Sequence, residues 1–320
     1  MTADMRGPGE RLNRAYSGVP TFLRSDYCDD IDALDADYVV IGVPYDDGSP
    51  FVGGSRFCAR AVREHSLRFG GGALYDIAED KEYLRAALAE RRLVDCGDVD
   101  VAPSRGDVTM ANLTRDVGRI LARDAMPIVL GGDHTLTYPV VRAFSRPIHV
   151  MQLDAHLDYS EVVQGMTYVN STSMRLIHQL GHVESLTQVG IRSMRDMKKN
   201  ADDARANGGR IMTMPAIRRD GAGAVADHLP QGADVYVTID IDAYDMSLCP
   251  GCVSAEPGGL TFEEMQAALR AISQRLNVVG FDFVEVNPPL EVGTGVTSYL
   301  GALTVAMFLG YIDDAARAVG

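Results

Sequence analysis

Runs of apolar residues that end in polar clusters recur along this chain of 320 residues. Three runs, at residues 127–130, 148–153 and 235–239, are rich in valine, isoleucine and leucine. Short, largely apolar runs of this kind, bounded by glycine and polar residues, are typical of buried β-strands. Acidic residues and histidine follow each run directly, so the polar chemistry gathers where the predicted strands end.

Helix-like stretches alternate with the strand-like runs, for example at residues 81–91, 112–123 and 261–274. Thr261 before Glu263 and Glu264 is a plausible N-cap followed by an acidic first turn. The apolar stretch at 296–311 is too short and too interrupted for a membrane span, so we expect a buried helix there. This alternation predicts an α/β fold, with helices on both faces of a mostly parallel central sheet and ligands at the carboxyl ends of its strands.

The length allows one large α/β domain or two small ones. The sequence has no linker, repeat or low-complexity run. We expect an N-terminal arm over residues 1–35, lying either across a neighbouring subunit or on its own, and one domain over residues 36–320.

Composition narrows the partners and the compartment. The net charge of −14, from 44 acidic and 30 basic residues, argues against nucleic-acid binding, which requires basic patches. The five cysteines and the polar N-terminal residues, which have no secretory pattern, lead us to expect free thiols and a cytoplasmic protein. We expect no membrane partner.

Three short segments carry the candidate chemistry: Gly131-Gly132-Asp133-His134, Asp154-Ala155-His156-Leu157-Asp158 and Asp240-Ile241-Asp242. Side chains alternate between the two faces of a strand, so residues two apart in an extended segment point the same way. We therefore expect six side chains to converge at the strand ends: His134, Asp154, His156, Asp158, Asp240 and Asp242.

Four carboxylates without a basic neighbour would repel one another, and two divalent cations would cancel their charge. Oxygen and imidazole ligands together suit divalent metals such as Mn²⁺, Ni²⁺, Fe²⁺ or Zn²⁺. A metal pair can hold a bridging water and lower its pKa until hydroxide forms near neutral pH. The segments therefore predict two divalent metal ions per chain.

At these three segments the chain resembles the ureohydrolases, the family of arginase, agmatinase, guanidinobutyrase and formimidoylglutamase. The similarity runs from about residue 42 to about residue 301. Glu256-Pro257-Gly258-Gly259-Leu260 and Val284-Glu285-Val286-Asn287-Pro288 resemble the agmatinase-like branch.

The resemblance implies an arginase-like three-layer αβα sandwich and hydrolysis of a guanidinium group to urea and an amine. One metal would take His134 and Asp158 and the other His156 and Asp242, while Asp154 and Asp240 bridge both. Glu285 would hold the guanidinium, as its forked N–H donors pair well with a carboxylate. We expect Asp133 to orient a ligand beside it. Our further candidates for substrate binding are Asn170, Ser171, Cys252 and Glu256.

The active-site loop departs from the family. Tyr168 stands where a proton-transferring histidine is usual, and no histidine lies between His156 and His178. Tyr168 either replaces that histidine or only shapes the pocket wall. Cys249 and Cys252 form a C-x-x-C pair, which we interpret as two small side chains in a substrate-side loop rather than as a zinc site or a disulfide.

These features predict a hydrolase of a small cationic guanidino compound such as agmatine or 4-guanidinobutyrate. An alternative substrate is a small or N-alkylated guanidine, or a biguanide such as metformin. A catalytically weak paralogue that supports an active partner chain, and a deacetylase-like amidohydrolase, are rival hypotheses. The resemblance favours Mn²⁺ or Ni²⁺, and it favours a homo-oligomer, trimer or hexamer, or a hetero-oligomer with a related chain.

Overall fold

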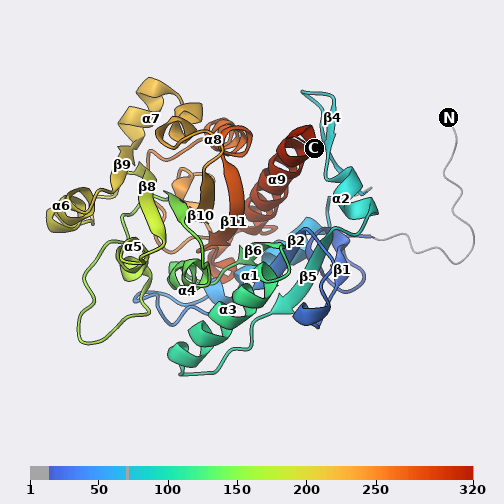
Figure 1. Cartoon of the computed structure of the whole chain (residues 1–320), viewed down its shortest axis with the longest axis horizontal. Helices are drawn as coiled ribbons and strands as arrows, with labels where there is room; N and C mark the ends of the chain where they lie inside the picture. Colours follow the sequence, from blue (N-terminus) through green and yellow to red (C-terminus); the bar gives the residue numbers. More distant parts are fainter. Residues whose placement is uncertain (1–13, 70–71, 320) are drawn as a thin grey trace, which may run out of the picture.

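The structure of the chain is a computed structural model, which describes residues 14–69 and 72–319. One sheet of nine strands, parallel throughout its pairings, forms its centre (Figure 1). Across the sheet the strands are β1 (Asp26–Tyr27), β5 (Leu93–Asp98), β2 (Tyr38–Gly42), β6 (Met126–Leu130), β11 (Asn277–Val284), β10 (Asp234–Asp240), β7 (Ile148–Leu153), β8 (Val183–Ile191) and β9 (Arg210–Thr213).

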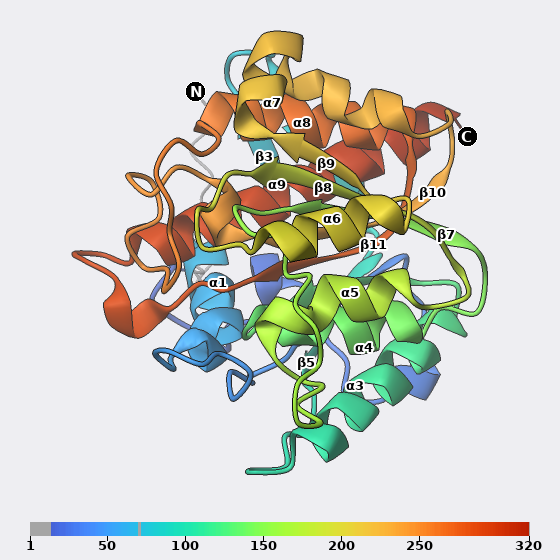
Figure 2. The ribbon, with the colours of Figure 1, turned by 90° about the vertical axis from the view of Figure 1, so that its left-hand side faces the viewer.

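Helices cover both faces of this sheet, and each face has its own apolar core (Figure 2). One core is shared with α1 (Cys58–Ser66), α7 (Met214–Asp220), α8 (Phe262–Arg275) and α9 (Val296–Val319). The other is shared with α3 (Gly106–Leu121), α4 (Thr137–Arg142), α5 (Ser173–His178) and α6 (Lys198–Ala206). The expected three-layer α/β fold with a parallel sheet is confirmed.

Two of the three expected helices are present. The helix expected at 112–123 lies within α3 except for its last two residues, and α8 corresponds to the helix expected at 261–274. At the start of α8, the Thr261 hydroxyl accepts a hydrogen bond from Glu264 N at 3.1 Å, and Glu264 accepts one from Thr261 N at 2.9 Å. This reciprocal capping box satisfies two backbone donors, which explains why the helix begins there.

The helix expected at 81–91 is wrong in its first half. Residues Lys81–Tyr83 form strand β4, which pairs antiparallel with β3 (Leu74–Asp76). A short helix, α2 (Arg85–Ala89), follows only after Leu84, whose φ of 62° breaks the helical path. Pairing with a strand outside the periodic window overrode the local helical propensity.

The apolar stretch at 296–311 belongs to α9, as expected, although the helix continues to Val319. Helix α9 is long and apolar enough to cross a membrane, but 78% of its most apolar stretch of 18 residues is buried inside the protein. It packs against α1 and α8, so it is a core helix here.

Part of the expected N-terminal arm adds to the sheet of its own chain. Strand β1 pairs with β5, and Phe22 N donates a hydrogen bond to Asp95 Oδ2 at 2.8 Å. Residues 1–13 of the arm lie outside the described residues. The boundary at residues 35 and 36 stays a prediction.

Candidate active site

Four neighbouring strands present the candidate residues. Strands β6, β11, β10 and β7 are adjacent in the centre of the sheet. Because these strands are parallel, their carboxyl ends meet at one edge of the sheet. The segments that follow them carry the six candidate metal ligands and Glu285.

The ligands converge through tight turns rather than through strand alternation. Strand β7 ends at Leu153; beyond it, Asp154 Oδ1 accepts a hydrogen bond from His156 N at 2.6 Å, and Asp158 has a left-handed φ of 46°. Asp240, the last residue of β10, likewise accepts a hydrogen bond at Oδ1 from Asp242 N at 2.8 Å. The expectation that extended backbone aligns these side chains is wrong, because the aspartates form turns with their own following backbone.

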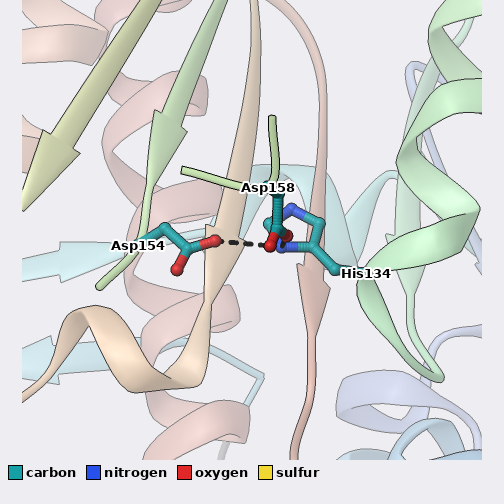
Figure 3. Close-up of side chains that lie close together, drawn as sticks. All are labelled: His134, Asp154 and Asp158. Carbon is teal, nitrogen blue, oxygen red and sulfur yellow. Dashed lines mark ion pairs between the residues drawn. The ribbon is translucent and has the colours of Figure 1, made fainter. Parts of the chain in front are cut away.

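His134 lies at the deep side of the cluster, at the start of a short 3₁₀ helix (His134–Leu136). Its Nδ1 is 3.0 Å from Asp154 Oδ2, 3.0 Å from Asp158 Oδ2 and 3.3 Å from Asp240 Oδ2. Figure 3 shows the carboxylates of Asp154 and Asp158 turned toward this ring. A buried nitrogen faced by three carboxylates is a geometry that suits one cation.

His156 forms the second part of the cluster. Its Nδ1 is 3.0 Å from Asp242 Oδ2 and 3.4 Å from Asp154 Oδ1. Asp154 therefore lies between the two histidines, with one carboxylate oxygen toward each. The ligand atoms of these groups lie within 4.8 Å of one another in each of two sets, His134 with Asp154 and Asp158, and Asp154 with His156 and Asp242.

The electrostatics show that the cluster lacks positive charge. Burial alone would lower the pKa of His156, but Asp242 and Asp154 outweigh it and raise this pKa to about 12. Burial also opposes protonation of His134, yet the surrounding aspartates raise its pKa well above the usual value. Burial raises the pKa of Asp158 to about 6. Without a metal, the site would have to protonate its own histidines, so it is suited to a bound cation.

The fixed tautomer of His134 supports this fit. Its Nε2 lies 2.8 Å from Thr238 Oγ1, and that hydroxyl donates to Asp282 Oδ1 at 2.6 Å. Because the single hydroxyl hydrogen goes to Asp282, Thr238 must accept from His134, which places the ring hydrogen on Nε2. The Nδ1 atom, which is buried and has no hydrogen-bond partner among the described residues, is left free to bind a metal.

Residues missed by the sequence reasoning hold Asp154 as well. Gln152 Nε2 donates to Asp154 Oδ2 at 2.6 Å, and Gln188 Nε2 donates to Gln152 Oε1 at 2.6 Å. Both glutamines are fully buried in strands β7 and β8. For Asp282 in β11, a charged residue within a largely apolar strand was a signal in the sequence. Gln188 gave none, because β8 also contains Glu184, Ser185 and Thr187.

Glu285 follows β11 with a left-handed φ of 68°, which is strained for a residue other than glycine. Its Oε1 accepts hydrogen bonds from His134 N at 2.9 Å and Asn170 Nδ2 at 3.3 Å, and its Oε2 accepts one from Ser55 Oγ at 3.4 Å. Burial, together with the charge of Asp133, raises the pKa of Glu285 to about 8. A carboxylate held in this way would gain from a cationic partner.

A cavity of about 400 Å³ adjoins the ligand cluster, and four of the six ligands line it together with Glu285. The loop after β2 contributes part of its wall, and so do the loops after β7, β8 and β10. The lining residues are Ser49, Pro50, Phe51, His156, Asp158, Ser160, Asn170, Ser171, Arg195, Asp196, Met197, Asn200, Asp240, Asp242, Val253, Ser254 and Glu285.

Six sequence candidates are not among the lining residues. Two of them, His134 and Asp154, belong to the ligand cluster itself. Asp133 caps the helical turn of His134, and its Oδ1 accepts from Thr135 N at 3.0 Å. Tyr168 packs against the core that α3, α4 and α5 share. Cys252 is a buried free thiol near Asp240 and Asp242, and Glu256 lies behind His156.

The C-x-x-C segment contains two free, buried thiols. Cys249 Sγ lies 3.5 Å from the carbonyl oxygen of Asp245, and Cys252 Sγ is an acceptor for Ser254 N at 3.4 Å. The segment therefore has no disulfide, and both thiols contact the backbone of their own loop.

The two histidines that follow Tyr168 in the sequence, His178 and His182, make their contacts outside the ligand cluster. His178 Nδ1 lies 2.8 Å from the Tyr159 hydroxyl, and His182 Nε2 lies 3.0 Å from Val141 O. Neither histidine lines the cavity.

Comparison with known proteins places this site in a family. Residues 36–310 match the model of the arginase family. The chain is 32% identical to proclavaminate amidinohydrolase from Streptomyces clavuligerus over 89% of this chain and 90% of that protein. It is 32% identical to agmatinase from Pyrococcus horikoshii, over 80% and 86% of the two chains, and 29% identical to guanidinobutyrase from Pseudomonas aeruginosa, over 90% of each.

A solved structure agrees with these sequence relatives. The structure of the Streptomyces clavuligerus enzyme superimposes with a TM-score of 0.80 at 30% identity, over 94% of this chain and 99% of the other. The fold, the ligand cluster and the sequence relatives agree. This chain belongs to the arginase family and is a metal-dependent amidinohydrolase of the ureohydrolase type.

Proposed function

We propose that this protein hydrolyses a C–N bond of a guanidino compound and releases urea. The observation that carries the proposal is the cluster of six metal-ligand side chains, four of which line one cavity together with Glu285. The family relatives include agmatinase and guanidinobutyrase, so agmatine and 4-guanidinobutyrate are the first substrates to test.

When bound, two divalent cations would lower the pKa of water and supply hydroxide near neutral pH. Glu285 would bind the guanidinium, since its carboxylate lies in the cavity and is fixed by His134 N and Asn170 Nδ2. These hydrogen bonds would hold the planar group in one orientation, and orientation is a large part of catalysis.

The test is a urea assay. Purified protein loaded with Mn²⁺ or Ni²⁺ is incubated with agmatine, 4-guanidinobutyrate, arginine, guanidine and metformin, and chelator-treated protein serves as the control. We expect urea from at least one compound, and only with metal. No urea from any compound with protein that holds two metals would contradict the proposed reaction.

A small or N-alkylated guanidine, or a biguanide such as metformin, is the second candidate substrate. The observation in its favour is the apolar part of the cavity wall, formed by Pro50, Phe51, Met197 and Val253. Hydrolysis of a biguanide would release a guanidine as the leaving group, and a guanidine needs less help from a proton donor than an alkylamine does. Comparison of kcat/KM for metformin and guanidine with kcat/KM for agmatine separates the two candidate substrate classes. A preference for agmatine above about tenfold, or roughly 1.4 kcal/mol, would rule out the small or N-alkylated guanidine.

The metal and the assembly belong to the proposal as well. Imidazole and carboxylate ligands bind Ni²⁺ more tightly than Mn²⁺, so supply in the cell would decide between them. Elemental analysis of the protein as isolated tests this, and Zn²⁺ as the one activating ion would contradict both choices. We propose a cytoplasmic homo-oligomer, or a hetero-oligomer with a related chain. Native mass measurement distinguishes them, and a fully active monomer would refute both.

A further inference from the structure

Arg195 is the one lysine or arginine, within the described chain, that lines the cavity. It lies after strand β8, and its side chain is 59% exposed. The other titratable lining residues are four of the six metal ligands (His156, Asp158, Asp240 and Asp242), Glu285 and Asp196. A cavity with acidic groups in its depth and one cation on its wall has two chemically different ends.

The position of Arg195 is held by its neighbours. Its Nε donates to Glu256 Oε1 at 3.0 Å, and its Nη2 donates to the carbonyl oxygen of Ser254 at 3.2 Å. Glu256 also accepts from Ser193 Oγ at 3.0 Å. Glu256 does not line the cavity whereas Arg195 does, so the guanidinium faces a ligand and its counter-ion lies behind it.

A bound metal would release part of Arg195. Its Nη2 lies 2.5 Å from His156 Nε2. Metal binding at Nδ1 leaves the ring hydrogen on Nε2, and two donors cannot share a hydrogen bond. Glu256 Oε1, 3.5 Å from Nε2, can accept that hydrogen instead. Arg195 then has three N–H groups without an acceptor among the described residues: one on Nη2 and the two on Nη1.

We infer that Arg195 is a specificity-determining residue, which favours substrates with a neutral or anionic far end and disfavours those with a second positive charge. The inference rests on the proposed function, because it places the guanidinium of the substrate at Glu285. The far end of an extended substrate then approaches the Arg195 wall. Like charges there repel, whereas a carboxylate can pair with the guanidinium.

Asp196 is the carboxylate that could oppose this effect. Its two oxygens accept from Leu157 N at 3.4 and 3.2 Å, which ties Asp196 to the ligand loop between Asp154 and Asp158. Both of its oxygens thus already face a protein donor. Variants of the neighbouring residues Arg195 and Asp196 therefore form a matched pair. Loss of the Arg195 charge should remove the discrimination against a second positive charge, and loss of the Asp196 charge should not.

The experiment uses three compounds that share a chain length and differ only at the far end: 4-guanidinobutyrate, 4-guanidinobutanamide and agmatine. In metal-loaded wild-type protein we expect kcat/KM for agmatine to be at least about tenfold below that for the amide. Arg195→Gln should bring this ratio close to one, mainly through the KM for agmatine, and Arg195→Lys should restore the discrimination. Asp196→Asn should leave agmatine disfavoured.

Metal content, measured for each variant, must equal that of the wild type for the comparison to count. Agmatine equal to or better than the amide in wild-type protein would overturn the role of Arg195 while leaving guanidino hydrolysis intact. An unchanged ratio in Arg195→Gln would overturn it too. If no compound yields urea, the proposed function fails, and calorimetric affinities of the same three compounds decide the role of Arg195 separately: agmatine binding as tightly as the amide overturns it.

Discussion

The two histidines of the ligand cluster present the same ring nitrogen, Nδ1, from very different surroundings. The side chain of His134 is 1% exposed, and its Nε2 bonds to Thr238, which bonds in turn to Asp282. The side chain of His156 is 14% exposed, and its Nε2 is shared between Arg195 and Glu256. The half of the centre around His134 is therefore in place before a metal binds, whereas the half around His156 must rearrange.

The difference follows from the elements that supply the supporting residues. Thr238 and Asp282 lie within the central strands β10 and β11, where packing fixes every side chain. Arg195 and Glu256 lie in loops after β8 and β10. Strands hold a common chemistry in place, while loops at the rim can change without loss of the fold and so determine specificity.

The largest effect is expected where both halves meet. Replacing Asp240 by Asn removes one of the negative charges near His134 Nδ1 and a ligand oxygen. We expect urea release to fall by about a thousandfold or more, since metal catalysis contributes several kcal/mol, and we expect fewer than two metals per chain by elemental analysis.

Asp245→Asn is the matched control for this variant. Asp245 lies shortly after Asp240 and Asp242 in the sequence, but its carboxylate accepts from Gly258 N and Gly259 N, outside the ligand cluster. It should retain two metals, although the loop would be less stable. Loss of metal in Asp245→Asn but not in Asp240→Asn would show that the ligand set is wrong.

The next effect concerns the deep half alone. The hydroxyls of Thr238 and Tyr236 both donate hydrogen bonds to Asp282. In Asp282→Asn, the amide nitrogen of the new side chain must face one of these two hydroxyls. The hydrogen of Thr238 would no longer be directed away from His134, so the tautomer would be less fixed. We expect metal affinity to fall about 10–100-fold, measured by competition with a chelator. Affinity within twofold of wild type would refute this role.

A smaller effect is expected for the corresponding change beside His156. In Glu256→Gln the carboxylate next to His156 Nε2 becomes neutral, but water can reach this side of the ring and replace the acceptor. We expect a loss of metal affinity below about tenfold. A loss as large as that of Asp282→Asn would remove the distinction between a prebuilt and an adaptable half.

The smallest effect is expected at Tyr168. Its ring packs against the core shared by α3, α4 and α5, and it does not line the cavity. Tyr168→Phe should leave kcat within about twofold, because a residue outside the cavity lining is not placed to exchange a proton with the substrate. A fall in kcat of a hundredfold, with unchanged metal content, would instead assign it the proton-transfer role of the missing histidine.

The sequence predicted those parts of the molecule that depend on local pattern. Buried parallel strands and the N-cap at Thr261 follow from residue type and spacing, and both are present. The pattern failed at residues 81–83, because their pairing partner lies outside the window that periodicity can examine.

At the site, the sequence identified residues that carry charge but not how they are supported. It placed Asp154, His156 and Asp158 together for the wrong reason, since turns and not strand alternation align them. Arg195 gave no signal, because an exposed arginine in a polar loop is ordinary until its position beside His156 is known. Contacts between distant loops decide which polar residues face the cavity, and no local pattern encodes them.

Calorimetric titration of chelator-treated protein with Mn²⁺ or Ni²⁺ measures how many cations the six ligands hold. We predict two per chain, with the first bound more tightly because the half around His134 needs no rearrangement, and with urea release only after both are bound. Binding of no cation, or full urea release with a single cation per chain, would contradict a binuclear centre.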